Sequence, residues 1–318
     1  MGLAMGTMAL FAPAISYSQP YPSKPIRIIV AFAPSGNIDI TARTISPGLS
    51  EILGQPVIVE NRGGAGGRIG ATLVAKSPPD GYTLLLGASG TLVAQPVFHD
   101  DIEYQPLRDF VYTSIIALVP SVLVVHPSLP VRSVKEIIAF ARARPGTLLM
   151  GSAGQGSGTH LMGELFQSMA KVKFVHVPYK SAATAVVDVL GGQVHLSFDQ
   201  VSSSGPFIKA DRLRALAVTT LQRSKFLSDV PTIDESGLRG YESSTYTTLA
   251  IPAATPKDVV QKLRDAVDAV VAQPRTREAF EKLGAEVERS TPEDVMRRVQ
   301  RDYVRWMRIR KETGIRID

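Results

Sequence analysis

The 318-residue chain contains no cysteine and only one tryptophan. Without cysteine, thiol catalysis, cysteine-ligated zinc sites and iron–sulfur clusters are excluded. Long linkers, short repeats and low-complexity tracts are also missing from the sequence. A boundary between domains must therefore be crossed by ordered chain rather than by a flexible tether.

Charge is missing from the first part of the chain, where no Lys or Arg precedes Lys24. Residues 1–18 contain an apolar run from Met8 to Ile15 and small residues at Ser16 and Ser18, which resembles the hydrophobic region and cleavage site of an export signal. The basic opening of such a signal is missing, and the run is well short of the ~20 residues of a membrane-spanning helix. The sequence predicts an exported, periplasmic protein, with a short membrane anchor as the alternative.

The overall composition is that of a globular protein, with 44% hydrophobic and 20% charged residues. The 35 Lys and Arg against 29 Asp and Glu give a formal charge of +6, and part of the excess lies between Arg297 and Lys311. Nucleic-acid binding by a basic helix is one interpretation. Tyr303 and Trp306 are three residues apart, which suits packing against a core better than stacking on bases, so we expect no nucleic-acid partner.

Strand-like and helix-like runs alternate along the remaining chain, a pattern typical of parallel sheets covered by helices on both faces. Extended runs near Ala117–Val125 and Ser243–Ile251 mark where the chain could pass between two lobes. We expect one lobe from residues 22–124 and 247–318, with a second lobe, residues 125–246, inserted into it. The expected strands are Ile26–Phe32, Val57–Glu60, Thr83–Leu86, Ser121–Val125, Thr147–Met150, Lys173–Val177, Val194–Phe198, Ala215–Val218 and Tyr246–Ile251.

Several helix boundaries carry recognisable capping residues. Ser133 with Glu136 forms the pattern of a capping box, which predicts a helix that runs to about Arg144. Thr255-Pro256 and Thr291-Pro292 each place a capping hydroxyl before a proline at the first helical position. Gly314 is expected to end the last helix.

Two glycine-containing turns each follow an apolar strand and precede a helix start. The first is Ala33–Asp39 and the second is Gly151–Thr159. Such turns present backbone N–H groups at a helix N-terminus, where the first donors lack intrahelical partners and the dipole favours negative charge. Two such turns far apart in the sequence predict two lobes that hold one acidic ligand between them.

The common catalytic and cofactor motifs fail on spacing. The third glycine of a dinucleotide fingerprint is replaced by Ile69 after Gly64 and Gly66, and by Thr159 after Gly154 and Gly156. No phosphate-binding loop, nucleophile elbow or H-E-x-x-H sequence is present. We therefore expect no catalytic residue, no metal and no cofactor.

Two acidic positions leave alternatives open. His160 and Glu164 would share a helix face and could ligate a metal, although a hydrogen bond at the helix start is the simpler role for His160. Asp39 could cap its helix locally, order the ligand loop or act as a base.

Residues Pro25–Gly314 resemble the solute-binding receptors of tripartite tricarboxylate transporters, the Bug family. The likeness depends on the order of several short segments over almost the whole chain rather than on any one of them. The matching segments are Pro34–Arg43, Val59–Gly67, Pro79–Leu84, Gly156–Phe166, His176–Lys180, Gly191–Val194 and Val230–Gly237.

The resemblance implies a two-lobed, periplasmic-binding-protein-like (Venus flytrap) fold, each lobe a mainly parallel sheet flanked by helices. It also implies a receptor that closes on a small carboxylate and delivers it to a membrane permease. Carried over by position, the ligand-binding residues would be Ala33, Pro34, Ser35, Gly36, Asn37 and Asp39 in the first turn, Ser89, Gly90 and Thr91 after the third strand, Ser152, Ala153, Gly154, Gln155, Ser157 and Thr159 in the second turn, and Asp199.

This sequence departs from the family pattern at some positions. Ser35 stands where the family usually has glycine, and Ser181 replaces a glycine after Tyr179-Lys180. Asp199 has an alternative role as a cap or turn residue at a strand end. An enzyme that uses Asp39 or Asp199 as a base, with His160 nearby, is the rival interpretation of the whole chain.

Overall fold

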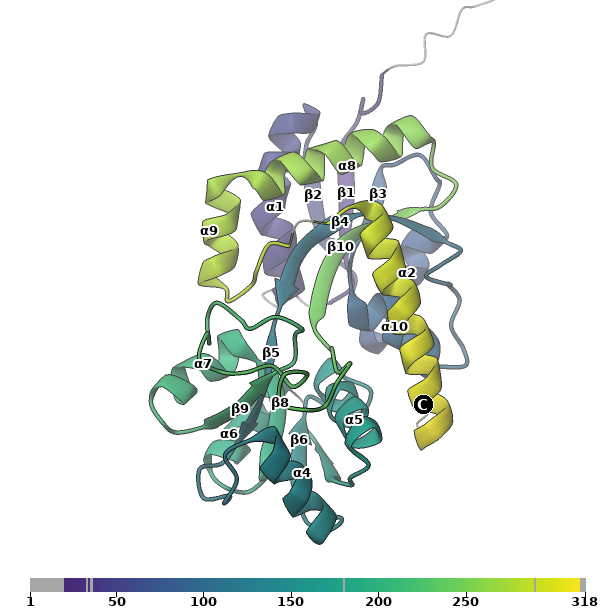
Figure 1. The fold of residues 1–318 in the computed structure, drawn as a ribbon. Helices are drawn as coiled ribbons and strands as arrows, with labels where there is room; N and C mark the ends of the chain where they lie inside the picture. Colours follow the sequence, from purple (N-terminus) through teal and green to yellow (C-terminus); the bar gives the residue numbers. More distant parts are fainter. Residues whose placement is uncertain (1–19, 33, 35–36, 180, 289, 315–318) are drawn as a thin grey trace, which may run out of the picture.

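The computed structural model describes residues 20–314 except 33, 35, 36, 180 and 289. It has two lobes, each built on one five-stranded sheet with helices on both faces (Figure 1). The expected two-lobed α/β fold is therefore confirmed. The expected export signal at residues 1–18 lies outside the described residues. Among the described helices, none is both long and apolar enough to cross a membrane.

The first sheet has the strand order β2-β1-β3-β10-β4. β1 is parallel to β2 and β3, whereas β10 is antiparallel to both β3 and β4. β1, β3 and β4 are almost entirely buried, because helices cover both faces of the sheet. The strands are β1 (Ile26–Val30), β2 (Val57–Asn61), β3 (Thr83–Ala88), β4 (Phe110–Val119) and β10 (Thr245–Pro252).

The second sheet repeats this arrangement in the order β7-β6-β8-β5-β9. β6 is parallel to β7 and β8, and β5 is antiparallel to β8 and β9. β5 and β10 thus occupy equivalent places, and each is the strand that has just arrived from the other lobe. The strands are β5 (Ser121–Val125), β6 (Leu149–Ser152), β7 (Val175–Pro178), β8 (Leu196–Gln200) and β9 (Arg214–Val218).

Each strand expected from the sequence overlaps a strand of the structure, but β4 was expected only as an extended run at its end. The expected division after residue 124 falls inside β5, all of which pairs within the second sheet. We propose that the boundary lies at Pro120, between β4 and β5, because the hydrogen-bonding partners of the chain change there.

The described helices lie in chain order between the strands. They are α1 (Asn37–Leu53), η1 (Ala65–Gly67), α2 (Arg68–Ala75), η2 (Gly90–Ala94), α3 (Gln95–Phe98), α4 (Val134–Ala143), α5 (Gly158–Ala170), α6 (Ala182–Leu190), α7 (Val201–Lys209), α8 (Lys257–Ala272), α9 (Pro274–Lys282) and α10 (Pro292–Thr313).

Most of the expected caps are found. Ser133 accepts a hydrogen bond from the Glu136 N–H, although the Glu136 carboxylate accepts from Arg132 rather than from the cap itself. Thr291 forms a complete capping box, and Gly314 ends α10 in the left-handed conformation. The expected cap at Thr255 is wrong: α8 begins one residue later, with Pro256 at the N-cap.

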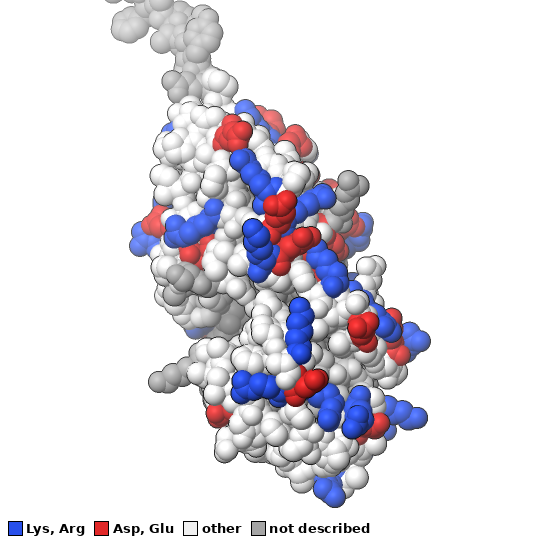
Figure 2. Space-filling model, turned by 90° about the vertical axis from the view of Figure 1, so that its left-hand side faces the viewer, with Lys and Arg blue, Asp and Glu red and all other residues white. Residues whose placement is uncertain are grey.

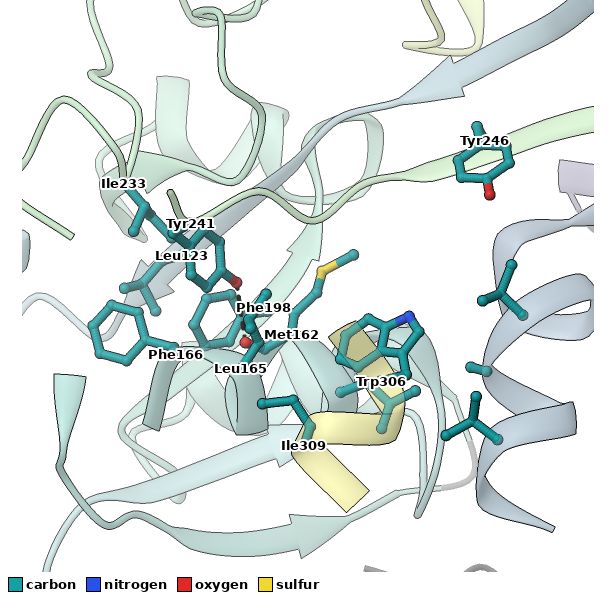
Figure 3. Close-up of a cluster of buried hydrophobic side chains, with 14 of the residues drawn as sticks. Leu123, Met162, Leu165, Phe166, Phe198, Ile233, Tyr241, Tyr246, Trp306 and Ile309 are labelled. Atoms are coloured by element: carbon teal, nitrogen blue, oxygen red, sulfur yellow. Dashed lines mark hydrogen bonds between the residues drawn. The ribbon is translucent and has the colours of Figure 1, made fainter. Parts of the chain in front are cut away.

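Helix α10 connects the two lobes. It runs along one side of the molecule from the first sheet toward the second (yellow in Figure 1) and contacts β4, η2 and α3 in the first lobe and α5 in the second. Trp306 and Ile309 on α10 belong to the same buried cluster as Met162 and Phe166 on α5 (Figure 3). The apolar face of the basic helix is therefore part of the core.

Gly70 on α2 lets that helix approach the chain that follows β1. A Cβ added there would lie 2.9 Å from the Arg62 carbonyl oxygen and 3.0 Å from the Ala31 Cα. Because backbone atoms cannot move aside, we expect Gly70→Ala to destabilise the protein by about 1–3 kcal/mol. Gly191→Ala is the matched control, since its added Cβ would meet no atom closer than 3.6 Å, and should change stability by less than about 0.5 kcal/mol.

Urea unfolding followed by circular dichroism measures both values. Equal stability of the two variants would contradict the close approach of α2 to the chain after β1.

Candidate functional site

Four loops meet at the carboxyl ends of the parallel strands. In each lobe, the strand that follows β1 or β6 in the chain pairs on one side of it (β2 or β7), and the next strand pairs on the other side (β3 or β8). The crevice where the strand order reverses in this way is where open α/β sheets bind ligands. The turns after β1 and β6, predicted from the sequence as anion-binding turns, begin at these reversal points.

The first turn is tied down from within its own lobe. Ala33, Ser35 and Gly36 lie outside the described residues, and Pro34 is exposed in the turn. Asp39 is buried and accepts hydrogen bonds from Arg43 Nε at 3.0 Å and from Asn61 Nδ2 at 2.9 Å. Asn61 Nδ2 also donates to the Phe32 carbonyl oxygen at 3.1 Å. The carboxylate of Asp39 therefore links the start of α1 to the end of β2.

One hydrogen bond joins the two lobes beside this turn. Asn37, the first residue of α1, donates through Nδ2 to Oε1 of Gln200 at the end of β8. Asn37 comes from the first lobe and Gln200 from the second, so the structure has the ends of β1 and β8 facing each other.

The second turn differs from its expected form. Three of its N–H groups, predicted to be available to an anion, are bonded to side chains of the same turn or of the helix that follows. Ala153 N–H donates to Thr159, Gly154 N–H to Ser152 and Gly156 N–H to His160 Nδ1. Hydroxyl and imidazole groups close to a turn compete for its backbone groups in this way.

The N-terminus of α5 retains donors that point along the helix axis. Ser157 is the N-cap and accepts from the His160 N–H at 3.3 Å. The N–H groups of Gly158 and Thr159 lie in the first turn, where no intrahelical acceptor exists. The Ser157 hydroxyl donates to the Gly154 carbonyl oxygen at 2.7 Å and lies 3.1 Å from the Thr159 hydroxyl. The anion-binding capacity of this loop therefore lies mainly in the helix start and in the Thr159 hydroxyl. Gln155 lies in the same turn.

The stacked imidazole rings of His160 and His176 pack against the second turn and hydrogen-bond to it. The rings of His160 and His176 are 3.9 Å apart and nearly parallel, and His176 Nε2 is 2.5 Å from the Ser152 hydroxyl. Burial, followed by the neighbouring His160, lowers the pKa of His176 to about 4. His160 Nε2 lies 3.5 Å from a Glu164 carboxylate oxygen. These contacts give both histidines a role in positioning the turn.

Asp199 is an unusual buried acid near the end of β8. Its side chain is 1% exposed, and Oδ2 accepts a hydrogen bond from the Ser204 hydroxyl at 2.6 Å. Oδ1 makes no hydrogen bond of good geometry among the described residues, although the Ser203 hydroxyl and the Gln200 N–H also lie near the carboxyl and favour its charged form. Burial raises the pKa of this carboxyl above its ordinary value.

The third predicted edge, Ser89–Thr91, lines a cavity of about 190 Å³ between the lobes. Gly158 of α5 and Ile38 of α1 also line it, so the cavity adjoins both turns. A further part of its wall, which comes from α10 and the segment before β10, was not predicted from the sequence. The periodicity of α10 indicated a buried face, but nothing in the sequence placed that face beside the ligand turns. This wall includes Glu242, Ser244, Arg298, Arg301, Asp302, Arg305 and Trp306.

The charged residues of α10 that line the cavity form ion pairs within the protein. Arg298 contacts Glu242 at 3.2 Å, and Arg301 contacts the same carboxylate at 2.9 Å. On the face drawn in Figure 2, basic and acidic side chains are intermixed rather than segregated. Within the described residues, no group of three or more His, Asp or Glu side chains is arranged to bind a metal ion.

Two lobes with loops facing each other at their strand reversals define a bilobed solute-binding protein. The chain matches the tripartite tricarboxylate transporter family receptors over residues 41–315 and belongs to that family. The Bug-family resemblance inferred from the sequence is therefore confirmed.

Relatives of known sequence are similar over nearly the full length. Protein BugT of Bordetella pertussis is 35% identical over 318 residues, which is 100% of this chain and 97% of BugT. A protein encoded in the tcbD–tcbE intergenic region of Pseudomonas sp. strain P51 is 39% identical over 310 residues, 97% of this chain and 91% of the relative.

Solved structures show the same architecture. The Rhodopseudomonas palustris protein Rpa4515, solved with adipate, is 38% identical with a TM-score of 0.78 and covers 93% of this chain and 99% of its own. MatC of the same organism, solved with malate, is 30% identical with a TM-score of 0.76, covering 91% and 99%. The periplasmic binding protein BugD is 34% identical with a TM-score of 0.75, covering 93% and 99%.

The low pKa of His176 predicts a loss of stability in acid. The folded protein resists protonating this ring, so the stabilising effect is complete above the ordinary pKa of 6.5 and is lost as the pH falls toward about 4. We expect His176→Gln, which keeps a donor for Ser152, to show a smaller loss of melting temperature over this range. Thermal unfolding at pH 4 to 8 tests this, and parallel curves for the two proteins would contradict it.

The raised pKa of Asp199 predicts the opposite dependence of stability on pH. Because its pKa is raised, the stability gained from its protonated form is complete below the ordinary value of 3.8 and is lost as the pH rises through the folded pKa. Asp199→Asn should therefore be more stable than the parent at pH 7, because the amide carries no charge to bury, by about 1.4 kcal/mol for each unit by which burial raises the pKa of Asp199. Urea unfolding measures the difference, which should shrink toward pH 4. A less stable variant at pH 7 would overturn this assignment.

Proposed function

We propose that this protein is a periplasmic receptor that captures a small organic carboxylate between its lobes and delivers it to the membrane permease of a tripartite tricarboxylate transporter. The observation that carries this proposal is the meeting of the loops after β1, β3, β6 and β8 at the strand reversals of both sheets. The relatives solved with adipate and malate share this architecture, which supports a carboxylate as the ligand class.

The carboxylate would lie between the two turns. From the second lobe it would meet the first-turn N–H groups of α5, next to the Ser157 cap, and the Thr159 hydroxyl. From the first lobe it would meet the start of α1 at Asn37 and the segment Ser89–Thr91. A charge at a helix N-terminus contributes only ~0.3–1 kcal/mol, whereas micromolar affinity corresponds to about −8 kcal/mol. Several donors from both lobes must therefore act together, which is the physical reason for closure.

Asp199 fits a second role at the same site. A buried carboxyl group with one oxygen that makes no hydrogen bond of good geometry can accept one from the ligand side, from a hydroxyl or a bound water. A carboxylate ligand placed directly against ionised Asp199 would be repelled. We propose that Asp199 orients the ligand indirectly while the N–H and hydroxyl donors hold the charge.

The contacts of the candidate catalytic groups favour binding over catalysis. An enzyme would need a base free to remove a proton from its substrate. Asp39 is held by Arg43 and Asn61, and His160 Nδ1 accepts the Gly156 N–H. Both groups act instead on the shape of the ligand turns.

Substitutions at Ser157 test where the ligand carboxylate binds. Ser157→Asp keeps an N-cap acceptor for α5 but adds a negative charge at the proposed site, so affinity for carboxylates should fall at least tenfold. Ser157→Asn has the same shape without the charge and should bind within a few-fold of the parent. Calorimetric titration with adipate, malate and benzoate measures both variants, and nuclear magnetic resonance of the recovered ligand checks for conversion.

Equal affinity of the aspartate and asparagine variants would show that the ligand carboxylate does not bind at this helix start. Chemical conversion of the ligand by the parent protein would show that the protein is an enzyme rather than a receptor.

A further inference from the structure

The cavity beside α10 limits the size and charge of the part of the ligand that the two turns do not contact. Its walls include Ser89, Gly90 and Thr91 on one side and Gly158 at the start of α5 on another. A carboxylate held at the α5 N-terminus would therefore have the rest of the molecule directed into this space. The inference below rests on the proposed carboxylate-receptor function and concerns the shape and charge of the ligand's remaining part.

The size of the cavity fits one ring. Its volume is about 190 Å³. A buried apolar cavity of about 150 Å³ is sufficient to bind benzene in another protein. The space beside α10 therefore accommodates a six-membered ring with a small substituent.

Apolar and aromatic side chains form much of its wall. Phe32 lies just after β1, Leu161 and Met162 lie on the first turns of α5, and Trp306 lies on α10. Figure 3 shows Met162 and Trp306 as neighbouring side chains contributed by facing helices. A flat apolar group in this space would replace water with dispersion contacts on several sides.

The arginines of the wall are already paired with carboxylates. Arg298 binds Glu288 at 2.9 Å as well as Glu242, and its Nη2 also donates to the Ser244 hydroxyl. Arg305 lies 3.5 Å from Asp302, and Glu242 is shared with Arg301.

A second ligand carboxylate would have to displace one of these partners and lie beside Glu242 or Asp302. Such a rearrangement leaves a buried carboxylate without its cation, which is strongly unfavourable.

We propose that this receptor selects an aromatic monocarboxylate of the size of benzoate, with its carboxylate at the α5 N-terminus and its ring in the cavity beside α10. The selection comes from the apolar walls and from arginines that are neutralised within the protein. Straight-chain dicarboxylates bind less tightly, because their distal charge enters a space with no uncommitted cation among its described lining residues.

The single tryptophan allows a local readout. Because Trp306 lines the cavity, a ring bound there changes its fluorescence emission. Calorimetric titrations with benzoate and adipate give the affinities, and fluorescence titration gives an independent value at the cavity. We expect benzoate to bind at least tenfold more tightly than adipate, with the same dissociation constant in both measurements.

Gly90 provides the cavity-filling variant. A Cβ added at Gly90 meets no atom within 4 Å, and the residue needs no left-handed backbone, so larger side chains extend into the open space. Gly90→Leu should weaken benzoate binding at least tenfold, whereas Gly90→Ala should weaken it much less. The melting temperature without ligand shows that each variant is folded, and the fluorescence titration of the parent protein remains decisive if Gly90→Leu is not.

The outcomes separate the two proposals. Adipate binding that equals or exceeds benzoate binding, or benzoate binding that leaves Trp306 fluorescence unchanged, overturns the aromatic selection but keeps the carboxylate receptor. Full benzoate affinity in a folded Gly90→Leu variant also overturns it. No binding of benzoate, adipate or malate by the parent protein overturns both proposals.

Discussion

The architecture depends on the hydrogen-bond ladders of two strands that arrive from the opposite lobe. β10 pairs with both β3 and β4, so the first sheet is complete only after the chain has returned from the second lobe. β5 holds the equivalent place between β8 and β9. Because an unpaired strand inside a buried sheet would leave backbone groups unsatisfied, both crossings are fixed in register. β3 and β8, which pair with these arriving strands, also pair with β1 and β6, the strands from which the two turns begin.

Helix α10 adds a second connection with a different character. Its apolar face joins the cores of both lobes through Trp306 and Ile309, while Arg298, Arg301 and Arg305 surround Glu242 in the segment that leads into β10. A helix that would look like a nucleic-acid-binding element from its charge alone thus forms one wall of the cavity between the lobes. Its positive charges are used within the protein, which leaves the cavity suited to an uncharged group.

Much of the fold could be predicted because the signals were local. Strand periodicity gave β1, β3 and β8 closely enough to place the turns after them, and the capping residues of α4 and α10 lie where the side chains indicated. The failures came from competition among neighbours. Thr255 does not cap α8, and the N–H groups of Ala153, Gly154 and Gly156 bond to side chains of their own loop, which spacing alone cannot reveal.

The sequence by itself determined the two-lobed α/β class, the family resemblance and the residue types that can bind an anion, because these follow from periodicity, order and side-chain chemistry. Only the tertiary structure decided which donors remain available, that Asp199 is buried, and that α10 closes a cavity beside the turns. These properties depend on distances between residues far apart in the chain, and such distances are fixed by packing rather than by local sequence.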